Sequence, residues 1–136
     1  MKVLFICRAN VGRSQIAEAM FNSISKKHKA ISAGLNPPEK WEGQKLSKTK
    51  FVAPSMIELD YNVDEKISKK ITNQMVDEAG KIIVIGEKDG WPDYLKKSDQ
   101  VSFWDVEDPD KGGLELHRRV RDQIKSLIED LVKEIG

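Results

Sequence analysis

The stretch that decides the fold lies at residues 2–14 and reads KVLFICRANVGRS. Residues 3–7 form a continuous apolar run rich in β-forming side chains, which is typical of a strand buried on both faces of a parallel sheet. From Ser14 onward, apolar side chains recur at the helical period, at positions 16, 17, 20, 21 and 24. The stretch therefore predicts a strand, a tight loop and a helix.

The same alternation continues along the chain. Further strands are predicted at 30–33, 81–85 and 101–104, and the run at 81–85 stops at Gly86. Helices are predicted at 54–60, where Pro54 suits the first turn, and at 116–135, where one face is apolar. The lysine-rich segment 41–50 is predicted to be a surface loop. Strands that alternate with helices predict a three-layer α/β architecture, with a four-stranded parallel sheet and helices on both faces.

Length and charge narrow the class of protein. A chain of 136 residues is predicted to form a single domain over 1–136. Lys plus Arg number 23 against 22 Asp plus Glu, and their even distribution argues against binding to nucleic acid or a membrane surface. The longest uncharged stretch, 30–38, is too short to span a bilayer, and no secretory leader is apparent. We therefore expect a cytoplasmic protein.

The chain has one cysteine, Cys7, which excludes an internal disulfide bond and a cysteine-based zinc cluster. His28 and His117 have no metal-ligand spacing, and we expect neither to be catalytic. Neither of the glycine-rich nucleotide-binding motifs is present. We therefore expect no metal and no cofactor.

The loop after the first strand has the composition of an anion site. Unpaired N–H groups and the positive dipole end of the next helix attract a doubly charged oxyanion. We expect Gly12 to take a left-handed backbone, so that successive amides form a nest, and Arg13 to clamp two oxygens. The residues expected to bind the oxyanion through this loop are Arg8, Ala9, Asn10, Val11 and Gly12.

The position of Cys7 at the start of this loop suggests chemistry. A positive field stabilises a thiolate, and a thiolate at the bottom of an anion site faces the central atom of the bound group. Ser14 is placed to donate a hydrogen bond to the sulfur when it leaves. A free cysteine alone is more often a small buried hydrophobe. The joint spacing of Cys7, Arg13 and Ser14 between a buried strand and a helix favours a nucleophile instead.

With these residues the chain resembles the low-molecular-weight protein tyrosine phosphatases and the thioredoxin-coupled arsenate reductases, which share the phosphatase I-like fold. The similarity extends to residues 32–34, to Asp108-Pro109 and to residues 118–122. It implies that Cys7 is the nucleophile, that Arg13 binds the phosphoryl group and that Asp108 is the general acid and base. It also implies that Asn10 holds the loop by side-chain hydrogen bonds.

Two features remain open. The acidic turn offers four candidate acids that the sequence does not rank, namely Asp105, Glu107, Asp108 and Asp110. Trp41, in a loop that borders the site in the family, is either an aromatic wall of the site or an ordinary loop residue.

The chain departs from both groups of relatives. Gly12 stands where the phosphatases usually carry a second cysteine, and Asp110 follows the Asp-Pro pair where they carry aromatic residues. Gly86 and Trp91 stand in the expected places of the cysteines by which the reductases pass a disulfide to thioredoxin. An internal thiol relay is therefore excluded.

The leading functional hypothesis is a cysteine-dependent phosphatase that hydrolyses phosphomonoesters, including protein phosphotyrosine, through a phosphocysteine. The expected partners are a phosphorylated protein or a small phosphomonoester, with phosphate and arsenate as simple ligands. One alternative is an arsenate reductase that borrows an external thiol such as glutathione or glutaredoxin. The other is a non-catalytic module that binds oxyanions or phosphoproteins.

Overall fold

Four strands form one parallel sheet in the order β2-β1-β3-β4 in the computed structural model, which describes residues 1–136. The strands are β1 (Lys2–Cys7), β2 (Lys29–Gly34), β3 (Lys81–Ile85) and β4 (Val101–Trp104). The chain passes from β1 to β2 on one side and later to β3 on the other, so the strand order reverses beside β1. Open α/β sheets bind ligands at the carboxyl ends of strands at such a point.

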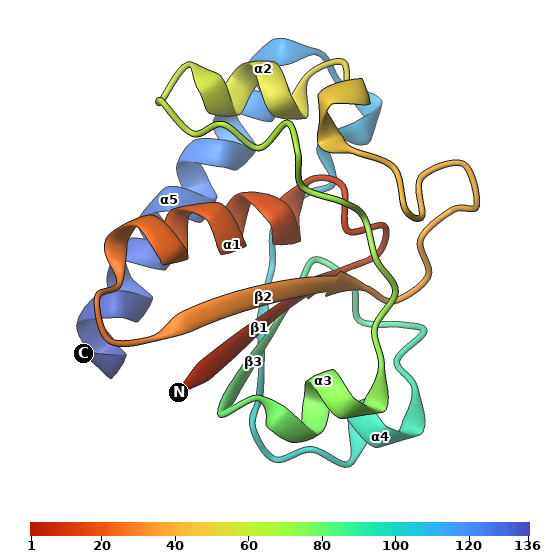
Figure 1. Ribbon diagram of the computed structural model, residues 1–136, viewed down its shortest axis with the longest axis vertical. Coiled ribbons are helices and arrows are strands. Elements are labelled where there is room, and N and C mark those ends of the chain that lie inside the picture. The colour runs from red at the N-terminus through yellow and green to blue at the C-terminus, as the bar shows by residue number, and fades with distance from the viewer.

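Helices cover both faces of this sheet (Figure 1). On one face lie α1 (Arg13–Ile24), α2 (Val52–Ile57) and α5 (Leu114–Ile135), and on the other lie α3 (Asn73–Glu78) and α4 (Asp93–Lys96). Two short 3-10 turns, η1 (Leu46–Lys48) and η2 (Pro109–Lys111), complete the structure. The three-layer architecture expected from the sequence is confirmed, although α3 and α4 were not predicted.

The first strand shows why the sequence specifies two covered faces. Its side chains alternate, so that Val3 and Phe5 pack with α1 and α5, whereas Leu4 and Ile6 pack on the side of α3 and α4. All four side chains are 0% exposed. Between Val3 and Ile6 the strand is buried on both faces and carries only apolar side chains, and its last residue, Cys7, is the first reactive group.

Two sequence expectations about the segment after β2 need correction. The helix predicted at 54–60 is α2, Val52–Ile57, which begins and ends earlier. The segment 41–50 is not simply a surface loop, because Leu46 is 0% exposed in the core cluster of α1 and α5. Its three lysines, Lys45, Lys48 and Lys50, do lie on the surface, whereas Leu46 and Thr49 are buried among them.

None of the helices combines the length and the apolar composition that crossing a bilayer requires.

Candidate active site

A cavity of about 450 Å³ opens at the carboxyl end of β1. Cys7 and the loop that follows it form one part of the lining. Other parts come from segments distant in the sequence, namely Pro38 to Trp41, Thr49 to Val52, Asp108 to Asp110, and His117. The fold therefore assembles around the cysteine a site that no single segment contains.

The sulfur of Cys7 is almost enclosed, since the residue is 2% exposed, and its Sγ lies 2.9 Å from Ser14 Oγ. The backbone of the loop differs from the expectation at one position. Gly12 has φ −115°, and the left-handed residue is Asn10, with φ 57°. Asparagine tolerates this conformation because its short polar side chain bonds nearby groups. The side chain of Asn10 is 0% exposed and faces the protein interior, so it does not line the cavity.

Gly34, at the end of β2, permits the close approach of the loop. A Cβ atom there would lie 2.7 Å from the carbonyl oxygen of Arg8. Any other residue would push the loop away from the sheet, and this gives a steric reason for the glycine in the 32–34 segment.

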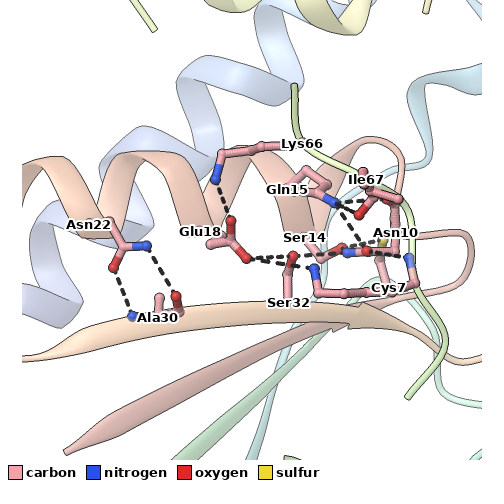
Figure 2. Close-up of polar contacts among 11 residues, drawn as sticks. Cys7, Asn10, Ser14, Gln15, Glu18, Asn22, Ala30, Ser32, Lys66 and Ile67 are labelled. Carbon is pink, nitrogen blue, oxygen red and sulfur yellow. Dashed lines mark hydrogen bonds and ion pairs between the residues drawn. The ribbon is translucent and has the colours of Figure 1, made fainter. Parts of the chain in front are cut away.

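A chain of buried hydrogen bonds beneath the loop fixes the direction of the Ser14 hydroxyl (Figure 2). Ser32 Oγ donates to Glu18 Oε1 at 2.9 Å, since a carboxylate only accepts. The Asn10 amide then donates to Ser32 Oγ at 2.9 Å and to Ser14 Oγ at 2.8 Å. Because Ser14 Oγ accepts from Asn10, its own proton is free to point at Cys7. The network therefore orients a donor toward the sulfur.

Neighbouring groups hold this network in place. Lys66 Nζ pairs with Glu18 Oε2, and the Asn10 Oδ1 atom accepts from the backbone N–H of Lys69 at 3.0 Å. Gln15 Nε2 donates to the same Oδ1 at 3.1 Å. Burial lowers the pKa of the Lys69 ammonium, whose nitrogen lies 4.0 Å from Glu18. With both Oδ1 bonds made, the amide of Asn10 has only one satisfactory orientation.

Arg13 begins α1, and its guanidinium is held at one end only. Its NH1 donates to the carbonyl of Val106 at 3.0 Å, and its NH2 donates to Glu87 Oε1 at 3.0 Å. The Nε–H makes no hydrogen bond within the protein, although the side chain is 5% exposed. The planar group is thus anchored by its far end, and its remaining donors are available to an oxyanion in the cavity.

Glu87 is a site residue that the sequence analysis missed. Its carboxylate bridges the two arginines of the loop, at 2.8 Å from Arg8 and 3.0 Å from Arg13. Partial burial acts to raise the pKa of Glu87, but the hydrogen bonds from the two arginines outweigh it and the pKa is lowered. The hydrogen bond that Arg8 donates to Glu87 in turn raises the pKa of Arg8. No motif marks Glu87, because its partners precede it by more than 70 residues.

Gly86, the residue before Glu87, leaves space for the side chain of Arg13. Its φ is +81°, and a Cβ atom there would lie 1.7 Å from NH1 of Arg13. A cysteine at this position, as expected in the reductases, is incompatible with the observed arginine. Trp91, at the other expected cysteine position, donates from Nε1 to the carbonyl of Glu87 at 2.7 Å. Both residues thus support the anchor of Arg13.

The structure distinguishes among the four acids of the turn. Asp108 and Asp110 line the cavity, whereas Asp105 and Glu107 do not. Asp108 Oδ2 lies 3.8 Å from Arg13 NH2, and the Asp108 side chain is 55% exposed. Its other oxygen accepts the backbone N–H of Asp110 at 3.0 Å. Asp108 is therefore the carboxylate that combines proximity to the anion site with access to solvent.

A family model described as "Low molecular weight phosphotyrosine protein phosphatase" matches residues 2–136. The chain is 29% identical over 137 residues to a glutaredoxin arsenate reductase of Synechocystis, covering 99% of this chain and 98% of the relative. It is 25% identical over 150 residues to a protein-arginine-phosphatase of Bacillus subtilis, covering 99% and 97%. Among solved structures, a low molecular weight protein tyrosine phosphatase from T. tengcongensis matches with TM-score 0.85, 23% identity and 99% of each chain covered. At that identity the structural match shows the fold alone.

Proposed function

Because the chain belongs to the low molecular weight phosphotyrosine protein phosphatase family, we propose that it hydrolyses phosphomonoesters, protein phosphotyrosine among them, by way of a phosphocysteine. The observation that carries this proposal is the placement of Cys7 Sγ on the cavity lining, 2.9 Å from a hydroxyl oriented toward it. Arg13 and Asp108 border the same cavity.

In the first step the loop amides and Arg13 bind the phosphoryl oxygens, and the Cys7 thiolate attacks phosphorus. The S–P bond forms as the bond to the leaving oxygen breaks, and Asp108 donates a proton to that oxygen. Donors fixed in advance around the phosphoryl group stabilise the charge that develops on it.

In the second step Asp108, now ionised, takes a proton from water, and the water oxygen attacks phosphorus. The S–P bond breaks, and inorganic phosphate and the thiolate are released. The Ser14 hydroxyl stabilises the departing sulfur through the hydrogen bond that the buried network directs at it. Each residue returns to its initial protonation state.

A second candidate function, an arsenate reductase that uses an external thiol, is favoured by the similarity to the Synechocystis glutaredoxin arsenate reductase. Arsenate has the shape and charge of phosphate and fits the same loop. The single sulfur of this chain then needs glutathione or a glutaredoxin to complete the reduction. The third candidate, a non-catalytic module, requires only the anion-binding part of the site.

The proposed partners are phosphorylated proteins or small phosphomonoesters, and we propose the cytoplasm as the compartment. A reactive thiol without a second cysteine is kept reduced there by the glutathione and thioredoxin systems.

One paired assay separates the three candidates. Turnover of an aryl phosphate is measured beside reduction of arsenate with glutathione and glutaredoxin present. The proposal predicts sustained aryl phosphate hydrolysis, with arsenate acting as a competitive inhibitor. Sustained arsenate reduction without phosphatase turnover supports the second candidate, and binding of phosphate without either turnover supports the third.

A further inference from the structure

His117, on the first turn of α5, forms part of the cavity lining although nothing in the mechanism above uses it. Its ring packs against Phe51, with ring centroids 5.1 Å apart and an interplanar angle of 44°. The residue is only 6% exposed. It is thus a deeply set polar ring held rigidly against an aromatic neighbour.

The hydrogen bonds of this ring determine its tautomer. His117 Nδ1 lies 2.9 Å from the carbonyl oxygen of Gly113, which only accepts, so Nδ1 carries a proton. In the neutral ring Nε2 is then a hydrogen-bond acceptor. Nε2 makes no hydrogen bond within the protein, and it is not one of the polar atoms that are both fully buried and unpaired. Because His117 lines the cavity, Nε2 is accessible from it. Besides the carboxylates of Asp108 and Asp110, the cavity therefore contains one neutral, oriented acceptor that makes no hydrogen bond within the protein.

We propose that His117 is a specificity-determining residue whose Nε2 accepts a hydrogen bond from an N–H group of the substrate's leaving group. The inference rests on the proposed phosphatase function. It favours phosphomonoesters carried by a peptide over simple aryl phosphates, and it extends the class to one phosphoramidate, a phosphorylated arginine, whose leaving atom is nitrogen. Such a substrate offers N–H donors near the phosphoryl group in two places. One is the peptide backbone, and the other is the guanidino group of a phosphorylated arginine side chain. A simple aryl phosphate offers neither.

The test compares His117→Phe with the parent on three substrates: para-nitrophenyl phosphate, a phosphotyrosine peptide and a phosphoarginine peptide. Phenylalanine keeps a flat ring against Phe51 and removes the acceptor. A second variant, His117→Gln, retains an acceptor oxygen close to the position of Nε2. His28→Phe is the matched control, because His28 is the other histidine of the chain and its ring hydrogen-bonds the N-terminus and the end of α5, away from the cavity.

We expect His117→Phe to lose about five- to tenfold in kcat/KM on a peptide substrate, the value of one hydrogen bond, and to keep aryl phosphate turnover within about twofold. His117→Gln is expected to regain most of the peptide activity, and His28→Phe to match the parent. Loss on both peptides identifies the backbone as the donor, and loss on the phosphoarginine peptide alone identifies the guanidino group.

An equal loss on all three substrates indicates a structural role for His117 and overturns the proposal, as does no loss on either peptide. Failure of the proposed function gives a different result, because the parent itself then leaves para-nitrophenyl phosphate unhydrolysed. In that case the affinity of the same variants for the two phosphopeptides still tests whether His117 accepts a hydrogen bond from an N–H donor.

Discussion

The loops that follow β1 and β3 leave neighbouring, equally buried strands and yet differ in what they contribute. The loop after β1 leads directly into the twelve-residue helix α1 and holds Cys7 above a buried hydrogen-bond network. The loop after β3 leads to the four-residue helix α4 and contributes an open backbone position, Gly86, and the carboxylate of Glu87. One loop therefore carries the reactive group, and the other positions the arginine that serves it.

The largest loss of activity is expected when the nucleophile on the β1 side is changed. Cys7→Ser is expected to lose all measurable turnover and to keep its affinity for phosphate, because the amides and Arg13 remain and a hydroxyl is a far weaker nucleophile. Steady-state assays with calorimetric phosphate binding check both parts. Retention of turnover within about tenfold of the parent would place the chemistry elsewhere.

The acid in the turn after β4 is expected to give the next largest effect. Asp108→Asn is expected to lose about 10²–10⁴-fold in kcat on a substrate with a poor leaving group, and much less on one with a good leaving group. Asp105→Asn, which changes an acid outside the cavity, is the control. If the control shows the larger and leaving-group-dependent loss, the assignment of the acid is wrong.

A comparison of two glycines tests whether the β3 loop acts by leaving space for the side chain of Arg13. Gly86 and Gly90 have nearly equal φ, +81° and +80°, but only at Gly86 would a Cβ atom collide with Arg13. Gly86→Ala is expected to lose about 100-fold in kcat/KM, since displacing a positioning group by about 1 Å costs this much. Gly90→Ala carries the same backbone strain in open space and is expected to keep its activity. Equal losses in the two variants would indicate backbone strain alone.

The smallest expected effect is on thermal stability, and it concerns Glu87 and Glu58, two carboxylates that each pair with two arginines. The pKa of Glu87 is lowered by Arg8 and Arg13 against the effect of burial, and hydrogen bonds from Arg118 and Arg121 lower the pKa of Glu58 to about 2. A lowered pKa stabilises the fold above pH 4.5, the ordinary value for a glutamate, and this stabilisation is lost as the pH falls through the lowered value.

Glu87→Gln and Glu58→Gln are therefore both expected to lower Tm near neutral pH by a few degrees, with a difference from the parent that narrows in acid. Thermal unfolding from pH 7 to pH 2 measures this. Only Glu87→Gln is expected to raise KM, since Glu87 pairs with Arg8 and Arg13, which line the cavity, whereas the arginine partners of Glu58 do not. A Tm difference that widens below pH 4.5 would contradict the sign, and a raised KM in Glu58→Gln would remove the distinction between the two carboxylates.

The comparison also separates what the sequence predicts from what it does not. The β1 loop is predictable because strand, loop and helix are contiguous and each has a local pattern. Within it, the expected left-handed residue was wrong: the left-handed conformation falls on Asn10, whose side chain is bonded to Ser14 and Ser32. Ser32 lies on a later strand, so that bond has no local signature.

Glu87 was unpredictable for a stronger reason, since an acidic residue in a Gly-rich turn usually faces solvent. Its role follows only from sheet order, which places the end of β3 beside the end of β1. The helix α3 did have a local signal, because Thr72 caps it by accepting the backbone N–H of Met75. His117 had no local signal, because its unpaired ring nitrogen results from the packing against Phe51 and the hydrogen bond at the start of α5.

The central claim is that Cys7 becomes covalently phosphorylated while the β3 loop only holds Arg13. The most direct measurement is acid quenching of the Asp108→Asn variant during turnover of para-nitrophenyl phosphate, followed by peptide mass mapping. Loss of the general base slows hydrolysis of the intermediate, so we expect a phosphoryl group on the peptide that contains Cys7, and none in Cys7→Ala, which has no nucleophilic atom at that position. Continued turnover with an unmodified Cys7 peptide, or with the phosphoryl group on another residue, would contradict the account.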